Sequence, residues 1–441
     1  MNAVFLAIVG IAFATAAVNQ LFGAPATPMP MDALGTAMLD AARSSVTLAL
    51  GLIGVMALFL GLMKVAEAGG LLVIIARLLR PLMVRLFPEV PPEHPAMGAM
   101  IMNLSANVMG LGNAATPFGI RAMQELDKLN PHKGTATNAM VLFLAVNTSS
   151  VTLLPTGVIA IRAAAGSTDP AAIVPTTLFA TICSTFIAIL AARFYSRFAA
   201  VPAPDPVTAP DSGSARLPAG EAVAAVPSAP AEPASATAEA PPGYPTWVSV
   251  LALCCILGMV PVTIVWGQTI APWIIPSLMV GLLTFGALRG VRVYEAFVEG
   301  AKDGFEVAVR IIPYLVAILV AVAMFRASGA MDMLIQPLGA VTRLVGLPPE
   351  ALPMALLRPL SGSGAYGIMV SIINDPEVGP DSYTGLLVST LQGSTETTFY
   401  VLAVYFGAVQ IRRIRHALAA GLTADFVGVV AAVAICLWLF G

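Results

Sequence analysis

Nine apolar stretches, each close to the ~20 residues that an α-helix needs to cross a bilayer, dominate the chain. They lie near residues 3–22, 45–63, 137–160, 172–195, 247–265, 269–288, 306–325, 384–406 and 418–440. Only 10% of the residues are charged, which is too few to cover the surface of a soluble fold. The sequence therefore predicts an all-α integral membrane protein, multi-pass in a bacterial inner (plasma) membrane.

The first apolar stretch, 3–22, has two interpretations. Small residues at Ala14 and Ala16 are typical of a signal-peptide cleavage region. However, no positive charge precedes the stretch, and it is nearly long enough to span. We favour a retained membrane helix.

Composition changes abruptly between residues 200 and 245, where Ala, Pro, Ser and acidic residues replace the apolar stretches. Such a segment cannot bury enough apolar surface to fold, so we expect a disordered linker. The chain is then divided into an N-terminal membrane half, 1–199, a linker, 200–245, and a C-terminal membrane half, 246–441.

Short motifs recur in the same order in the two halves, as expected of internal repeats. Pro91-Pro92-Glu93 corresponds to Pro348-Pro349-Glu350, and Asn147-Thr148-Ser149 corresponds to Gln392-Gly393-Ser394. A chance match is the alternative to a repeat.

The positive-inside rule assigns sides to the loops. Arg412, Arg413 and Arg415 place the loop before the last apolar stretch in the cytoplasm, and counting back places Lys133 there too. The acidic loop around Glu377 then falls outside. The polar segments of the two halves are entered from opposite sides, so the sequence predicts two inverted-topology repeats.

Two segments, 96–120 and 353–372, are too polar and too rich in glycine for helices that face lipid. Irregular backbone at membrane depth is tolerated only where it is buried in protein or lines a wet cavity. Two such segments at matching places predict re-entrant hairpins with broken helices and a binding site near the midplane. Glycine- and serine-mediated helix contacts are the alternative.

Two apolar stretches carry polar runs, at 147–156 and 392–398. Glu396 is the most informative residue, because a carboxylate inside a span is costly unless it is paired, protonated or hydrated. Arg358 is its expected partner. Glu396 either binds a proton or neutralises a cation, or it forms with Arg358 a fixed pair that only holds the hairpin.

Polar side chains from both halves are expected to bind a small polar solute by replacing its water. The predicted set is Ser105, Asn107, Asn113, Thr116, Asn147, Ser149, Ser361, Ser363, Gln392, Ser394, Thr395 and Glu396, with Glu396 and Arg358 as the charge pair.

Several function classes are disfavoured. The net charge of −2 gives no basic field for nucleic acid. No phosphate-binding G-x-x-x-x-G-K-[ST] loop is present, and the three histidines show no metal-ligand spacing. We expect no cofactor, no metal and no enzymatic activity, since no nucleophile–base pair is evident.

Long motifs in both halves resemble those of the spore maturation protein A and B family, as if the two were fused. The resemblance covers about 45–195 and 245–441, and it rests on NLSANVMGLGNAATPFGIRAMQELD, RPLSGSGAYGI and GPDSYTGLLVSTLQGSTETTFYVLAVYFGAVQIRRIRHAL. The wider group carries the nucleoside-recognition or Gate domain, which is similar to part of concentrative nucleoside transporters and of ferrous-iron transport protein B. This resemblance implies hairpins from opposite sides with unwound helices between them, but fold does not transfer the substrate.

We therefore predict a secondary transporter that works by alternating access, with about nine spans and two re-entrant hairpins. A proton or sodium ion is the expected coupling partner, the bilayer is the solvent, and a homo-oligomer is compatible with the sequence. The alternatives are a passive channel, which would show flux without ion coupling, and a non-transporting envelope scaffold. A scaffold predicts a dry centre whose polar groups are satisfied only by each other.

Overall fold

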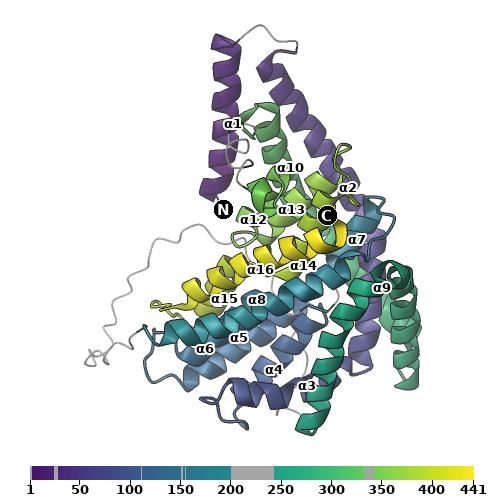
Figure 1. Cartoon of the computed structure of the whole chain (residues 1–441), viewed down its shortest axis with the longest axis vertical. Helices are drawn as coiled ribbons and strands as arrows, with labels where there is room; N and C mark the ends of the chain where they lie inside the picture. Colours follow the sequence, from purple (N-terminus) through teal and green to yellow (C-terminus); the bar gives the residue numbers. More distant parts are fainter. Residues whose placement is uncertain are drawn as a thin grey trace.

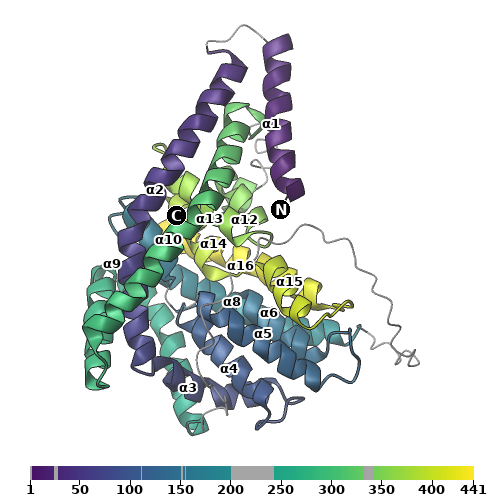
Figure 2. The same ribbon diagram turned by 180° about the vertical axis from the view of Figure 1, so that it is seen from behind.

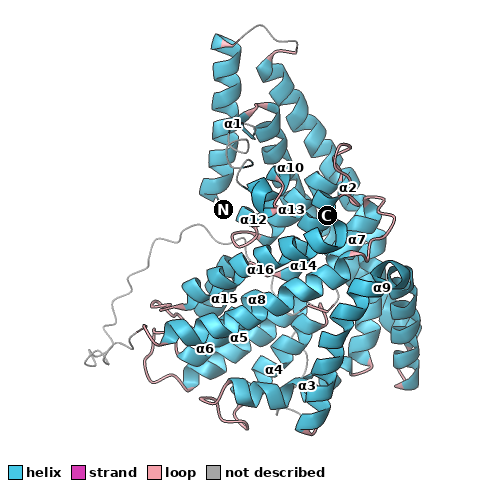
Figure 3. Ribbon diagram, in the orientation of Figure 1, coloured by secondary structure: helices cyan, strands magenta, loops and turns pink. Residues whose placement is uncertain are grey.

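The computed structural model describes residues 2–23, 28–110, 112–149, 152, 153, 155–199, 243–331, 333, 339 and 342–441. Within these residues the chain is all-helical, and the only β contact is an isolated bridge between Thr135 and Arg413 (Figure 3). The predicted all-α fold class is therefore confirmed. Most of the predicted linker, 200–242, lies outside the described residues.

The first half contains α1 to α8. Their bounds are α1 Asn2–Phe22, α2 Pro30–Ala68, α3 Leu71–Leu86, α4 Pro95–Val108, α5 Gly112–Lys128, α6 Asn138–Ser149, α7 Thr156–Ala164 and α8 Ile173–Ser196. The second half begins at α9. It comprises α9 Thr246–Leu288, α10 Val293–Ala327, the 3-10 helices η1 Arg343–Val345 and η2 Pro349–Ala351, α12 Leu352–Leu357, α13 Gly362–Ile373, α14 Tyr383–Ser394, α15 Thr398–Ala408 and α16 Ala417–Phe440.

Three described helices are long and apolar enough to cross a membrane, namely α8, α16 and the part of α1 from Phe5 to Phe22. A fourth candidate is the bent pair formed by the end of α2 and α3, whose axes differ by 69°. Together with the composition, these helices identify a membrane protein. The number of crossings stays a prediction.

Two predicted spans are broken in the structure. The stretch 137–160 is divided between α6 and α7, and 384–406 is divided between α14 and α15. Proline precedes α7 at Pro155, and the backbone of Thr395 is extended (φ −138°, ψ 161°). The continuous helices predicted there are wrong because a polar run with proline, or with several Thr residues, interrupts each one.

Another difference concerns α9. The stretches 247–265 and 269–288, predicted as two spans, both fall within this one helix of 43 residues. The residues between them, 266–268, contain no proline, and the helix runs through them.

The breaks predicted in 96–120 and 353–372 are present. Helix α4 ends before Met109, and Gly110 has a positive φ of 77°, which glycine adopts without strain. Helix α12 ends at Leu357, before Pro359, and Ser361 caps α13 by accepting a hydrogen bond from the backbone amide of Gly364.

The same order of elements therefore occurs twice. A long helix (α2 or α10) precedes a broken pair (α4 and α5, or α12 and α13), a second broken pair (α6 and α7, or α14 and α15) and a long apolar helix (α8 or α16). Helices α2 and α10 pack along each other, as do α8 and α16 (Figures 1 and 2). The opposite orientation of the two halves in a membrane stays a prediction.

Each of the two largest hydrophobic cores is shared between the halves. One core combines α4, α5 and α6 with α15 and the first part of α16. The other combines α7 and part of α8 with α12, α13, α14 and the rest of α16. Helices of both halves therefore pack together in each core.

Candidate functional site

A main-chain hydrogen bond connects the break between α6 and α7 to the break between α14 and α15. The backbone amide of Glu396 donates to the carbonyl of Thr148 over 2.8 Å. Thr148 lies in the last turn of α6, whereas Glu396 lies in the extended segment between α14 and α15. This hydrogen bond joins the polar run of one half to that of the other. We call Thr148 and residues 395–397, with the side chains packed on them, the junction.

Arg358 supports the broken backbone on the second-half side of the junction. Its side chain is buried, and it donates to the carbonyls of Gln392 (3.2 Å) and Thr395 and to the hydroxyl of Thr397 (3.0 Å). The carbonyls near a helix end have no partner within the helix, so a guanidinium can satisfy several at once. Arg358 therefore holds the end of α14 and the start of α15 in place.

Glu396 lies near Arg358 without a direct hydrogen bond to it. The nearest distance, from Arg358 Nη2 to Glu396 Oε2, is 3.9 Å, and 45% of the Glu396 side chain is exposed. The predicted partners are thus neighbours, but the donors of Arg358 are used mainly by the backbone. Glu396 is more accessible than the sequence suggested for a carboxylate inside a span.

On the first-half side, amides and a tyrosine form a polar cluster. Asn107 donates from Nδ2 to Asn147 Oδ1 (2.9 Å), and the Asn147 amide donates to the carbonyl of Phe143. The hydroxyl of Tyr405, from α15 of the other half, lies 3.5 Å from Asn147 Oδ1 and accepts from Asn103 Nδ2 at 3.1 Å. This cluster therefore also combines both halves.

Close approach of Tyr405 depends on Gly119. A Cβ atom at position 119 would lie 2.2 Å from the Tyr405 hydroxyl oxygen, so a larger residue would displace the ring.

The sequence did not single out Asn103 or Tyr405 as site residues. Since Tyr405 is 258 positions from Asn147, only the fold could reveal the contact.

Several predicted hydroxyl residues have local partners. Ser105, Ser149 and Ser394 each donate to a carbonyl of their own helix. Ser361 acts as a helix cap. The side chains of the predicted residues Asn113 and Ser363 lie outside the described residues, and Thr116 is half-buried in α5.

Asp425 was missed by the sequence analysis and lies beside the junction. It is buried in α16, and its Oδ2 accepts a hydrogen bond of 2.6 Å from the hydroxyl of Thr398, the first residue of α15. The sequence does contain a signal for it. Asp425 is the one acidic residue in the otherwise apolar stretch 418–440, and an acidic residue inside a membrane span indicates a functional site.

Buried polar atoms around the junction lack hydrogen-bond partners among the described residues. They are Asn103 Oδ1, Gln392 Oε1, Thr177 Oγ1, Asp425 Oδ1 and Arg358 Nε. Since buried polar groups are almost always satisfied, such a group of unpaired atoms requires an explanation. Four of the five are oxygens, so a molecule that donates hydrogen bonds would complement most of them.

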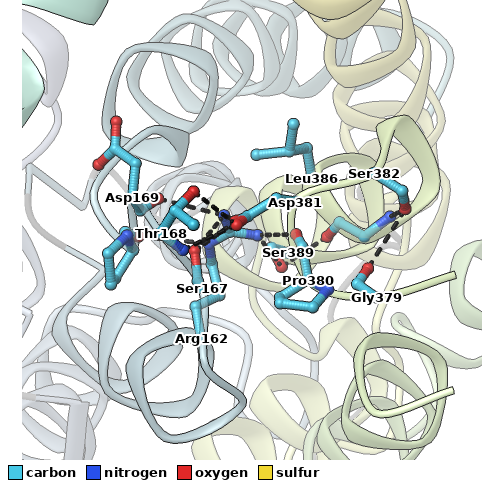
Figure 4. Close-up of polar contacts among 12 residues, drawn as sticks. Arg162, Ser167, Thr168, Asp169, Gly379, Pro380, Asp381, Ser382, Leu386 and Ser389 are labelled. Atoms are coloured by element: carbon cyan, nitrogen blue, oxygen red, sulfur yellow. Dashed lines mark hydrogen bonds and ion pairs between the residues drawn. The ribbon is translucent and has the colours of Figure 1, made fainter. Parts of the chain in front are cut away.

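A second polar network joins the halves at a different level. Arg162 of α7 is fully buried and lies between the loop before α8 and the loop before α14 (Figure 4). It donates to Asp381 Oδ1 (3.0 Å), to the Ser167 hydroxyl (3.0 Å) and to the carbonyl of Pro380 (2.5 Å). The amide of Thr168 donates to the other carboxylate oxygen of Asp381.

A third polar contact between the halves joins the segment before α16 to the start of α6. Arg415 donates to the carbonyl of Ala136 (3.1 Å) and to Asn138 Oδ1 (3.0 Å). A cavity of about 270 Å³ lies there, and residues lining it include Glu89, Asn130, His132 and Arg415. This cavity lies away from the junction.

The geometry defines a helical membrane protein whose two halves meet at broken, polar helices. The family model described as nucleoside recognition (Gate) matches residues 49–166 and 308–412, which include all four breaks. The chain therefore belongs to the nucleoside recognition (Gate) family. No solved structure matches it.

Two relatives from Bacillus subtilis (strain 168) are similar to parts of the chain. Spore maturation protein B is 49% identical over 167 residues, which are 38% of this chain and 93% of that protein. Spore maturation protein A is 48% identical over 159 residues, which are 36% of this chain and 81% of that protein. Each match covers only part of the chain, which is consistent with a fusion of the two.

Proposed function

We propose that this protein is an inner-membrane secondary transporter of a small polar solute, which binds at the junction and crosses by alternating access. The observation that carries the proposal is the group of unpaired buried atoms where the broken helices of the two halves meet. Broken helices in matching places of two repeats are the usual location of a transporter site.

Nucleosides are the first solute class to test. The matching family model is described as nucleoside recognition, and a nucleoside carries hydroxyl and amino donors that suit the oxygens of Asn103 and Gln392. Both relatives are named for spore maturation, and the same setting is proposed for this chain.

The scaffold alternative has weaker support. Several polar pairs do satisfy each other, such as Asn107 with Asn147 and Thr176 with Thr390. A dry, fully satisfied centre would leave no unpaired oxygens, because each costs free energy when buried. A passive channel would use the same residues and differs only in lacking ion coupling.

Binding can be tested on the purified full-length protein by thermal unfolding with a panel of nucleosides, amino acids and sugars. A ligand of the folded state raises the unfolding midpoint by mass action. We expect at least one nucleoside to raise the midpoint, and Gln392→Leu to reduce that shift. The control is Gln124→Leu, which makes the same replacement at an exposed site on α5 and should bind normally.

Absence of any shift across the panel would contradict the proposal. Equal shifts in the Gln392 and Gln124 variants would instead place the site away from the junction.

A further inference from the structure

Asp425 is an acidic residue in the middle of an apolar helix. The residue is only 4% exposed. It lies beyond residue 412, where the family match ends, so the match does not account for it. Asp425 shares one face of α16 with Gly421 and Gly428, four residues before it and three after it.

This face of α16 lies against the break between α14 and α15. A Cβ atom at Gly421 would lie 2.8 Å from the methyl carbon of Thr398, and one at Gly428 would lie 2.8 Å from the methyl carbon of Thr395. The two glycines therefore let α16 approach the break closely on both sides of Asp425. The carboxylate is positioned against the extended segment that also contacts Thr148.

The partners of the two carboxylate oxygens differ. Oδ2 accepts the hydroxyl of Thr398 at 2.6 Å, whereas Oδ1 is buried with no partner among the described residues. A carboxylate at membrane depth with one hydrogen bond is costly to keep ionised. The cost is relieved by an ion pair, by a bound metal cation or by a proton.

An ion pair is not made within the described part of the chain. Arg358 acts electrostatically on Asp425, but its donors go to Thr397 and to the carbonyls of Gln392 and Thr395. The elements packed on α16 are α6, α8, α14 and α15. Helix α6 carries no titratable residue, and the titratable or charged groups of the others and of the break are Cys183, Arg193, Tyr195, Tyr383, Tyr400, Tyr405 and Glu396.

A metal cation is a poor match. Hard cations are held by about six or more oxygen ligands. Around Asp425 the described oxygens are the Thr398 hydroxyl, which binds it, and the hydroxyls of Ser184 and Thr148 beside the flanking glycines, which donate to main-chain carbonyls. With the two carboxylate oxygens these are fewer than six. A proton needs only the carboxylate itself, because it neutralises Asp425 by forming one O–H bond and leaves no charge behind.

We propose that Asp425 is the proton-binding site of this protein. Its protonation changes the hydrogen bond to Thr398 and thereby affects the break between α14 and α15. This inference rests on the proposed transport function and assigns its coupling ion. Asp425 takes up one proton from water and releases the same proton to water. The ionised form accepts the Thr398 hydroxyl, and the neutral form replaces that charge-assisted bond with a weaker one.

Because Thr398 begins α15 and Thr397 binds Arg358, the change is transmitted to the backbone that contacts Thr148. The proposal separates Asp425 from Glu396, which is partly exposed and next to Arg358. Asp425 would carry the proton, and Glu396 would not.

The test is pH-difference infrared spectroscopy on the purified full-length protein in lipid, with no solute present. Protonation of a buried carboxylate produces a carbonyl band of the neutral acid. We expect this band in the wild type, its loss in Asp425→Asn and its retention in Glu396→Gln. Thr398→Val keeps the acid and removes its partner, so the band should persist at a shifted frequency.

A band that is absent in the wild type, or that is kept in a folded Asp425→Asn variant, would overturn the inference. If Asp425→Asn fails to fold, an unshifted band in Thr398→Val would overturn it independently. The measurement needs no transported solute, so it separates the two proposals. The band can be present while every flux assay fails, which would overturn transport alone, or absent while solute still crosses, which would overturn the proton site alone.

Discussion

Arg162 Nη2 and Asp381 Oδ1 lie 3.0 Å apart and join α7 of the first half to the loop before α14 of the second. Arg162 is completely buried and also donates to main-chain carbonyls, whereas 38% of the Asp381 side chain is exposed. A helix and a loop that lie more than 200 positions apart in the sequence are thus held together by one guanidinium and one carboxylate.

Neutralising this carboxylate should destabilise the protein. We expect Asp381→Asn to lower the free energy of unfolding by about 1–2 kcal/mol, less than the ~3–5 kcal/mol for a fully buried pair, because one partner is solvated. Urea unfolding of the purified protein measures the change. Glu377→Gln, an exposed site in the same loop, is the matched control and should have no effect. Equal stability of the two variants would show that the contact does not hold the halves together.

The same contact predicts a dependence on pH. Burial alone would raise the pKa of Asp381, but hydrogen bonds from Ser167 and Thr168 and the charge of Arg162 outweigh it and lower the pKa below its usual 3.8. The folded state therefore binds this proton less readily than the unfolded state does. The stabilisation is complete above pH 3.8 and is lost as pH falls through the lowered pKa. Unfolding midpoints measured through this acid range should fall more steeply for the wild type than for Asp381→Asn.

The inverted arrangement can be tested by labelling. Single cysteines at Lys133 and at Glu377, in a background without the four native cysteines, should react with an impermeant reagent from opposite sides of the membrane. The background matters because Cys254 and Cys255 are exposed. In the structure, Gly134, next to Lys133, contacts the segment before α16, whereas the loop of Glu377 lies near the Arg162 network. Labelling of both cysteines from one side would contradict inverted repeats.

Arg358 and Glu396 should contribute unequally to stability. Arg358→Met leaves the buried carbonyls of Gln392 and Thr395 without a donor, at about 1–3 kcal/mol each. Glu396→Gln should cost less than about 1 kcal/mol, because the side chain is partly exposed and makes no hydrogen bond to Arg358. The double variant should be no more stable than Arg358→Met alone. Its recovery to wild-type stability would mean that the two residues form the fixed ion pair considered from the sequence.

The sequence predicted the helical fold and the first break of each half, because Asn, Gly and Pro at 103–117 and 358–364 cannot form a lipid-facing helix. It did not predict the second breaks. An average over about twenty residues stays apolar at 384–406 even though three residues at its centre, 395–397, leave the helix. Hydropathy measures composition, whereas a break depends on local backbone partners such as Thr148 and Arg358.

The same reasoning explains which site residues were missed. Asp425 is one acid among 24 residues of an apolar helix and hardly changes its hydropathy. Arg162 and Tyr405 acquire their roles from residues of the other half, 219 and 258 positions away. Glu396 stood out in the sequence because it is a carboxylate inside a predicted span, but it lies in the break between α14 and α15, where 45% of its side chain is exposed.

Solute uptake into proteoliposomes tests the central claim most directly, with purified protein, a pH gradient and the nucleoside that gives the largest thermal shift. The account predicts saturable uptake by the wild type, loss of uptake in Asn147→Leu and normal uptake in Gln124→Leu. Asn147 binds Asn107 beside the junction, whereas Gln124 is exposed on α5, so both variants exchange an amide for an apolar group but only one alters the site. Folded wild-type protein without uptake, or equal uptake by the two variants, would contradict transport through the junction.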